Sequence, residues 1–178
     1  TLVVGAYYKN TVEGAAYVFT RSSGAWRQAA KLTAFDGGAS DGFGFSVAMS
    51  SDATTLVVSA YGKKSGTNAG QGAVYVFTGS GWSNVEKLTA SDGAGLDTFG
   101  VSVATSSDGS TVVVGAPGRR LNGQVSTHSG AVYVFTGSGG VWTEQQTLVA
   151  SDAGPYDSLG GSVAVSGDGG TLAAAARS

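Results

Sequence analysis

The fold is decided by a seven-residue stretch that reads Gly-Ala-Val-Tyr-Val-Phe-Thr from Gly130 to Thr136. The same stretch stands at residues 72–78, and a version with Ala in place of the first Val stands at residues 14–20. Both intervals are 58 residues (14 to 72 and 72 to 130). Self-similarity at such an interval indicates a repeat architecture. Because the stretch is apolar at consecutive positions, it predicts a strand that is buried on both faces.

Two further patterns repeat together with this strand. A Trp followed six residues later by Leu occurs at Trp26, Trp82 and Trp142, and we expect these Trp side chains to fill the wide outer part of each unit. An Asp that precedes Phe-Gly or Leu-Gly and then Ser-Val-Ala occurs at Asp41 and twice more. These features return at intervals of 56 and 60 residues (41 to 97 and 97 to 157), so only loops vary in length.

Each complete unit is expected to contain four strands. In the second unit these are strand one (43–48), strand two (55–60), strand three (72–78) and strand four (82–90). Four short strands per repeat are typical of a β-propeller blade. The sequence therefore predicts an all-β fold, a β-propeller built of four-stranded antiparallel blades. A β-solenoid is the alternative, but its coils are usually shorter than these units.

The strands also predict how much of a ring is present. Strand two occurs four times, whereas the other three strands occur three times each. We therefore expect a partial blade at 1–34, complete blades at 35–90 and 91–150, and a partial blade at 151–178, about three blades' worth of a larger ring. Propellers close with roughly four to eight blades. Other blades or chains are expected to complete the ring, because an open wedge exposes apolar faces and unpaired strand edges.

Composition excludes several functional classes. The 178 residues include 30 Gly and no Cys, only 12% are charged, and the formal net charge is -2. This charge offers no basic surface to a nucleic acid backbone, so nucleic acid is not an expected partner. No apolar stretch approaches the roughly 20 residues that span a bilayer, so no membrane insertion is expected in this segment. Without Cys, neither a disulfide framework nor a Cys-based zinc site can form.

The third unit resembles the FG-GAP repeat of integrin α-subunit N-terminal propellers. The resemblance rests on segments in the family's order: Phe99-Gly100, Ser102 to Ala104, Asp108-Gly109, Val113 to Pro117 and Gly130 to Phe135. The second unit departs from it at residues 59–61, where Ser-Ala-Tyr replaces Gly-Ala-Pro, and the fourth has Leu-Gly at 159–160. The resemblance covers essentially the whole chain, but it fixes packing and turn residues, which are specific for fold and weak for function.

The resemblance implies a non-catalytic extracellular or cell-surface module for adhesion, protein–protein interaction or structural assembly, with an extracellular protein or glycan as ligand. The alternatives that it leaves open are a carbohydrate-binding, lectin-like propeller and an accessory propeller domain of an exported enzyme. The chain contains no Asn-x-Ser/Thr sequon, although its Ser/Thr-rich loops would allow O-linked sugars.

All nine Asp residues fall at three equivalent positions of the repeat. One position lies between strands one and two, where a single carboxylate per loop predicts a hairpin turn. The other two positions lie five residues apart in the loop that precedes strand one. Two carboxylates with Gly carbonyls make a minimal Ca²⁺ site, and turns stabilised by Asp side chains explain the same residues without metal. The candidate calcium ligands are Asp36, Asp41, Asp92, Asp97, Asp152 and Asp157.

An enzyme is not expected. The chain has one His, His128, in a loop of the third unit, and its equivalents in the other units are not His, so a solvated loop side chain is the simpler interpretation. The loops between strands two and three vary most and carry aromatic and basic residues, which suit sugars, sulfates or acidic peptides. A solvated rim that keeps the protein soluble is the alternative. The candidate ligand-binding rim comprises Tyr7, Tyr8, Lys9, Tyr61, Lys63, Lys64, Arg119 and Arg120.

Overall fold

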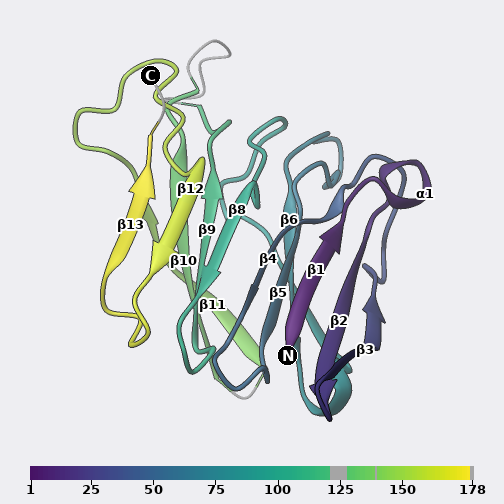
Figure 1. The fold of residues 1–178 in the computed structure, drawn as a ribbon. Coiled ribbons are helices and arrows are strands. Elements are labelled where there is room, and N and C mark those ends of the chain that lie inside the picture. Colours follow the sequence, from purple (N-terminus) through teal and green to yellow (C-terminus); the bar gives the residue numbers. More distant parts are fainter. Residues whose placement is uncertain (121–127, 139, 177–178) are drawn as a thin grey trace.

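The computed structural model describes residues 1–120, 128–138 and 140–176, and these contain four antiparallel sheets (Figure 1). One loop of the expected blade 91–150 and the last two residues of the partial blade 151–178 lie outside the described residues. The first sheet has the order β1-β2-β3, the second β4-β5-β6-β7, the third β8-β9-β10-β11 and the fourth β12-β13. The all-β, four-stranded organisation predicted from the repeat is confirmed, and the sheets do not close into a ring.

The strand bounds follow the repeat closely. The first sheet contains β1 (Leu2–Ala6), β2 (Ala15–Ser22) and β3 (Ala25–Leu32), and the second contains β4 (Phe43–Met49), β5 (Leu56–Ala60), β6 (Ala73–Thr78) and β7 (Asn84–Leu88). The third contains β8 (Ser102–Thr105), β9 (Thr111–Ala116), β10 (Ala131–Ser138) and β11 (Val141–Leu148), and the fourth contains β12 (Ser162–Val165) and β13 (Leu172–Ala175). Two short helical turns complete the elements, α1 (Lys9–Val12) and η1 (Ser80–Trp82).

Neighbouring sheets are joined where strand three of one begins beside strand one of the next. Isolated parallel bridges connect Gly14 to Phe43, Gly72 to Phe99 and Gly130 to Leu159. A Cβ on Gly72, which has φ +92°, would lie 2.0 Å from the Phe99 carbonyl oxygen. Since only Gly tolerates both that backbone conformation and that proximity, the repeated Gly lets consecutive sheets approach at this point.

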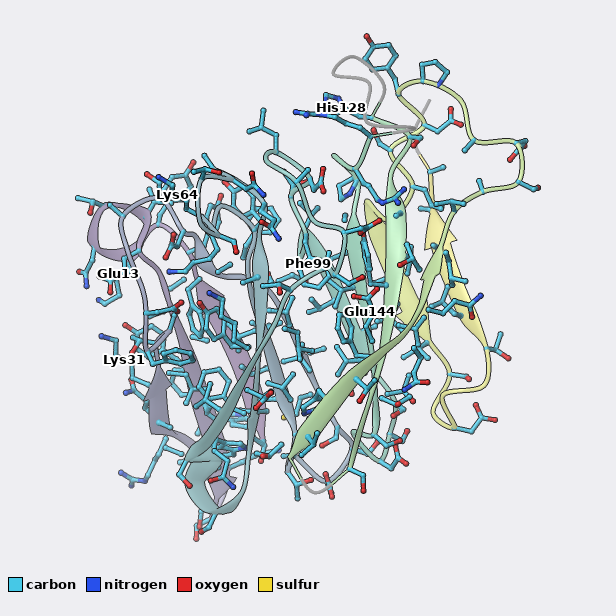
Figure 2. The ribbon with its side chains drawn as sticks, turned by 180° about the vertical axis from the view of Figure 1, so that it is seen from behind. Glu13, Lys31, Lys64, Phe99, His128 and Glu144 are labelled. Atoms are coloured by element: carbon cyan, nitrogen blue, oxygen red, sulfur yellow. The ribbon has the colours of Figure 1, made fainter. Side chains whose placement is uncertain are left out.

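The apolar core lies between the sheets. One cluster joins the first and second sheets and includes Val18 of β2 with Leu56 and Tyr75 of the second sheet. The other joins the second and third sheets and includes Val57 of β5 with Val112 of β9. Consecutive residues of β5 thus point into different clusters, which explains why every residue of this strand is buried. Figure 2 shows Phe99 inside the molecule, between sheets.

The Trp residues fill less of the interior than the sequence predicts. Trp26 is 50% exposed, and Trp82 and Trp142 are half-buried. Trp82 lies in η1 rather than in strand four, and its indole Nε1 donates a hydrogen bond of 2.9 Å to the Ala53 carbonyl oxygen. Trp82 packs against the core between the first and second sheets as a partly buried side chain.

The fourth sheet exposes surface that the second sheet buries. All five residues of β5 are buried, whereas the equivalent β13 has a half-buried Leu172 followed by exposed Ala residues. The edge of β13 that does not face β12 pairs with no strand among the described residues. Among the same residues, no helix is long and apolar enough to cross a membrane.

Candidate functional site

The Asp residues between strands one and two stabilise hairpin turns, as the sequence predicts. Asp108 accepts hydrogen bonds from the Ser106 hydroxyl at 2.6 Å and from the Ser110 backbone N–H at 3.0 Å. These hydrogen bonds lower the pKa of Asp108 to about 2, and the bond from the Ser106 hydroxyl has the largest effect. Asp52 and Asp168 repeat the arrangement with Ser50 and Ser166. Each carboxylate is thus engaged within its own turn.

The second Asp of each loop preceding strand one also has a local role. Asp41 accepts a hydrogen bond of 2.8 Å from the Gly38 N–H, and Asp97 accepts one of 2.7 Å from the Ala94 N–H. Asp157 repeats it with Gly154 at 2.6 Å. The side chain thereby closes a four-residue turn. Burial raises the pKa of Asp97, because desolvation disfavours its charged form.

The first Asp of the loop connects to strand three of its own sheet. Asp36 accepts a hydrogen bond of 2.5 Å from the Tyr75 hydroxyl, and Asp92 accepts one of 2.7 Å from the Tyr133 hydroxyl. Burial raises the pKa of Asp36, but hydrogen bonds from Lys87 and Tyr75 outweigh it, so the pKa is lowered overall. The sequence placed these carboxylates in a loop but gave no sign that each receives a Tyr hydroxyl from strand three.

Positively charged side chains lie beside the carboxylates for which the sequence predicts calcium binding. The Lys63 ammonium lies 2.8 Å from Asp41 Oδ2 and 3.6 Å from Asp36 Oδ2. In the third sheet, Arg119 contacts Asp92 Oδ2 at 2.5 Å. Among the described residues, no three or more His, Cys, Asp or Glu side chains form a group that could hold a metal. In the loops that precede β4 and β8, the carboxylates therefore suit a Lys or Arg side chain better than Ca²⁺, which needs six to eight oxygen ligands.

The structure brings three of the predicted rim residues into one aromatic cluster. The ring centroids of Tyr7 and Tyr8 are 4.4 Å apart, and Tyr7 lies 5.1 Å from Phe45 in an edge-on arrangement. Phe45 in turn lies 4.4 Å from Tyr61. Tyr8 is 72% exposed and Phe45 is 38% exposed, so the cluster presents ring surface to solvent. We call these four residues the aromatic cluster.

Phe45 is the member that sequence reasoning missed, because it was interpreted only as part of strand one. The signal was its position directly after Phe-Gly, where the other units have Val101 and Gly161. These three residues line a hollow of about 440 Å³ together with Pro117, which occupies the repeat position of Tyr61, and Ser158. The hollow therefore runs past equivalent positions of successive sheets, and Phe45 is the aromatic residue in its lining.

The basic residues of the predicted rim do not form one group. Lys64 is exposed and stands on the rim in Figure 2, whereas Lys63 is buried and holds Asp41. The ammonium of Lys9 lies 6.0 Å from the centre of the Tyr17 ring. Arg119 is engaged by Asp92, and Arg120 forms a backbone bridge with His128. The positive charge predicted for ligand binding is thus partly used inside the fold.

His128 lies beside an aromatic ring. Its ring centroid is 6.2 Å from that of Tyr156, in an edge-on arrangement. Figure 2 places His128 at the same end of the molecule as Lys64.

A family model of the FG-GAP repeat matches residues 26–77, 82–135 and 142–177. The chain belongs to the FG-GAP repeat family. No curated protein matches it. The three matched FG-GAP segments begin at the repeated Trp, and each crosses from one sheet into the next. The first two run through strand three, and the third ends after β13. The Phe-Gly of the family pattern includes Gly100, whose φ is +96°.

The Gly of Val-Val-Gly-Ala-Pro also lies at a contact between sheets. A Cβ on Gly115 would lie 1.9 Å from the Gly160 carbonyl oxygen of the next sheet. Both halves of the pattern therefore serve contacts between consecutive FG-GAP sheets. The aromatic cluster and the hollow lie on positions that these contacts leave variable.

Proposed function

We propose that this FG-GAP chain is a non-catalytic extracellular interaction module that binds its ligand at the aromatic cluster and the adjacent hollow. The observation that carries the proposal is the convergence of Tyr7, Tyr8, Phe45 and Tyr61 from different segments into one partly exposed surface. Exposed aromatic groups beside a hollow are typical of binding sites rather than of ordinary solvated surface. FG-GAP repeats are often found in extracellular proteins, which supports the proposed location.

The non-catalytic part of the proposal is supported by the engagement of the carboxylates. The Asp residues at the repeated positions of the second and third sheets accept hydrogen bonds from Ser, Tyr or backbone groups of their own unit. A general acid or base has to be available to a substrate. The hollow is lined by aromatic, aliphatic, Gly and Ser residues, none of which titrates near neutral pH.

A carbohydrate is the second candidate for the ligand. Aromatic rings present flat apolar surfaces with a polar edge, and three of the four rings in the cluster carry a hydroxyl. The apolar face of a sugar can stack on such a ring while its hydroxyl groups bond to the polar atoms around it. A protein ligand would use the same rings as anchors, because Tyr is enriched at interaction surfaces.

Direct binding measurements distinguish these ligands. The chain is applied to a glycan array and to a panel of extracellular matrix proteins, with Tyr61→Ala as the test variant and Tyr156→Ala as the matched control. Tyr156 is 59% exposed and lies outside the aromatic cluster. We expect Tyr61→Ala to reduce binding at least tenfold and Tyr156→Ala to leave it unchanged. Equal binding by both variants would refute the assignment of the ligand site to the cluster.

A further inference from the structure

A second pocket, of about 160 Å³, lies between the second and third sheets and shares no residue with the aromatic cluster. Its walls come from the turns that join β8 to β9 and β10 to β11, together with residues at the ends of β5 and β6. These turns lie at the end of the sheets away from α1 (Figure 1). We call it the Trp142 pocket, and its side chains are Thr55, Thr78, Asp108, Ser110, Ser138 and Trp142.

Hydrogen bonds between the turns fix the walls of the Trp142 pocket. The Ser51 N–H of the second sheet donates to the Ser107 carbonyl oxygen of the third at 2.9 Å. The Gly137 N–H donates to the Ser110 carbonyl oxygen at 2.8 Å. A Cβ on Gly137 would lie 2.5 Å from Trp142 Cδ2, so the indole lies directly against the Gly137 backbone. The pocket is therefore preformed, as ligand pockets usually are.

Several polar groups of the pocket have no partner among the described residues. Thr55 is 6% exposed, and within that part of the chain its hydroxyl forms no hydrogen bond. A Cβ on Gly109 would lie 2.4 Å from Thr55 Oγ1, so the absence of a side chain there keeps this hydroxyl accessible. The Thr78 and Ser138 hydroxyl groups and the Trp142 indole N–H likewise form no hydrogen bond with a described residue. All four groups are thus available to a ligand.

The equivalent place between the first and second sheets is filled differently. There the Trp82 indole Nε1 donates a hydrogen bond of 2.9 Å to the Ala53 carbonyl oxygen. Ala53 also carries a methyl group where the third sheet has Gly. The hairpin before Trp142 is two residues longer than the one before Trp82 (137–141 against 79–81). The longer hairpin keeps Trp142 in β11, where its N–H is not used by the neighbouring turn.

We propose that the Trp142 pocket binds the terminal ring of a neutral glycan. The proposal does not depend on the function proposed for the aromatic cluster. An indole offers a flat apolar surface with a polar N–H edge, which suits the C–H face of a sugar ring. Thr and Ser hydroxyl groups both donate and accept hydrogen bonds, as sugar hydroxyl groups do. A volume of about 160 Å³ is below the roughly 300 Å³ of the smallest drug-sized pockets, so the pocket encloses a single ring.

Asp108 determines the charge of the ligand. The lowered pKa of this residue, about 2, keeps its carboxylate charged at neutral pH. Asp108 Oδ2 accepts a hydrogen bond of 2.9 Å from the Ser110 hydroxyl, and a carboxylate oxygen can accept a second one from a sugar hydroxyl. None of the residues that line the pocket is basic. A uronic acid would therefore be repelled, whereas an uncharged sugar would not.

NMR signals of the indole N–H groups test this proposal, because the chain has three Trp residues and each gives one signal. Single Trp→Phe substitutions assign the signals. The probes are the methyl glycosides of glucose, galactose and mannose, with the methyl glycoside of glucuronic acid and tetramethylammonium as charged probes. Thr78→Val is the test variant. Thr20→Val is the matched control, because Thr20 holds the same repeat position in the first sheet and is also half-buried.

We expect at least one neutral glycoside to shift the Trp142 signal at millimolar concentration and to leave the Trp26 signal unchanged. The glucuronic acid glycoside should bind more weakly. Thr78→Val should lower the affinity about fivefold, because a hydrogen bond is lost, and Thr20→Val should leave it unchanged. Ser138→Ala, at an exposed residue of the pocket, replaces Thr78→Val as the test if the latter lowers the melting temperature.

Three results would overturn the proposal. The first is a Trp142 signal that no neutral glycoside shifts. The second is equal affinity of the parent and the test variant for the glycoside that binds. The third is a larger shift with tetramethylammonium than with any glycoside, which would assign the pocket to a cation held by the Trp142 ring and the Asp108 carboxylate.

Discussion

The second and fourth sheets have the same sequence pattern and different surroundings. Strand two of the second sheet, β5, is buried at every residue, whereas strand two of the fourth, β13, is exposed at three of its four. The second sheet lies between two others and contributes residues to both core clusters. In repeat proteins each unit is stabilised mainly by its neighbours. Among the described residues, burial of strand two therefore follows whether a neighbouring sheet packs on each of its faces.

The largest expected effect is the difference between two equivalent Leu-to-Ala substitutions, one in the second sheet and one in the fourth. Leu56→Ala should destabilise the protein by about 2 to 5 kcal/mol, because Leu56 is fully buried and the change leaves a cavity. Leu172→Ala should cost less than about 1 kcal/mol, because Leu172 is already half in solvent. Thermal unfolding followed by circular dichroism measures both. Similar melting temperatures for the two variants would show that the fourth sheet is as well packed as the second.

The next effect separates two adjacent Lys residues of the same loop. Lys63→Ala should cost about 3 kcal/mol, because the buried Asp41 carboxylate loses its ion-pair partner. Lys64→Ala, the control, should be within about 0.5 kcal/mol of the parent, because Lys64 is exposed. If Lys63→Ala has the same melting temperature as the parent, the ion pair with Asp41 does not contribute to stability.

The smallest effect concerns calcium and compares a chelator with a double substitution. EDTA should leave the melting temperature unchanged, because Lys63 already pairs with Asp41 in the second sheet and Arg119 with Asp92 in the third. Asp92→Ala combined with Asp97→Ala should lower it, because the bonds to Tyr133 and to the Ala94 N–H are lost. A fall with EDTA that added Ca²⁺ reverses would instead establish the calcium site predicted from sequence.

Much of the fold could be predicted because the residues that fix it act locally or through strict repetition. Tyr-Val-Phe strands, Gly at positive φ and Asp in hairpin turns each specify a strand or a turn with little help from distant residues. The recurrence of these features then determined the number of sheets and their order. The exact start of strand four was not predictable in the second sheet, because η1 at Trp82 interrupts the pattern that the other units follow as strand.

What the sequence determined by itself was the family, the four-stranded unit and the turn role of Asp52, Asp108 and Asp168, since all of these depend on residues close together in the chain. The tertiary structure decided which residues meet across long separations. Tyr75 reaches Asp36 across 39 residues, and Phe45 joins Tyr7 and Tyr61 only because successive sheets place their inner strands side by side. It also decided that Lys63 is internal while Lys64 faces solvent, because a side chain's surroundings depend on the packing of the loop and not on its sequence neighbours.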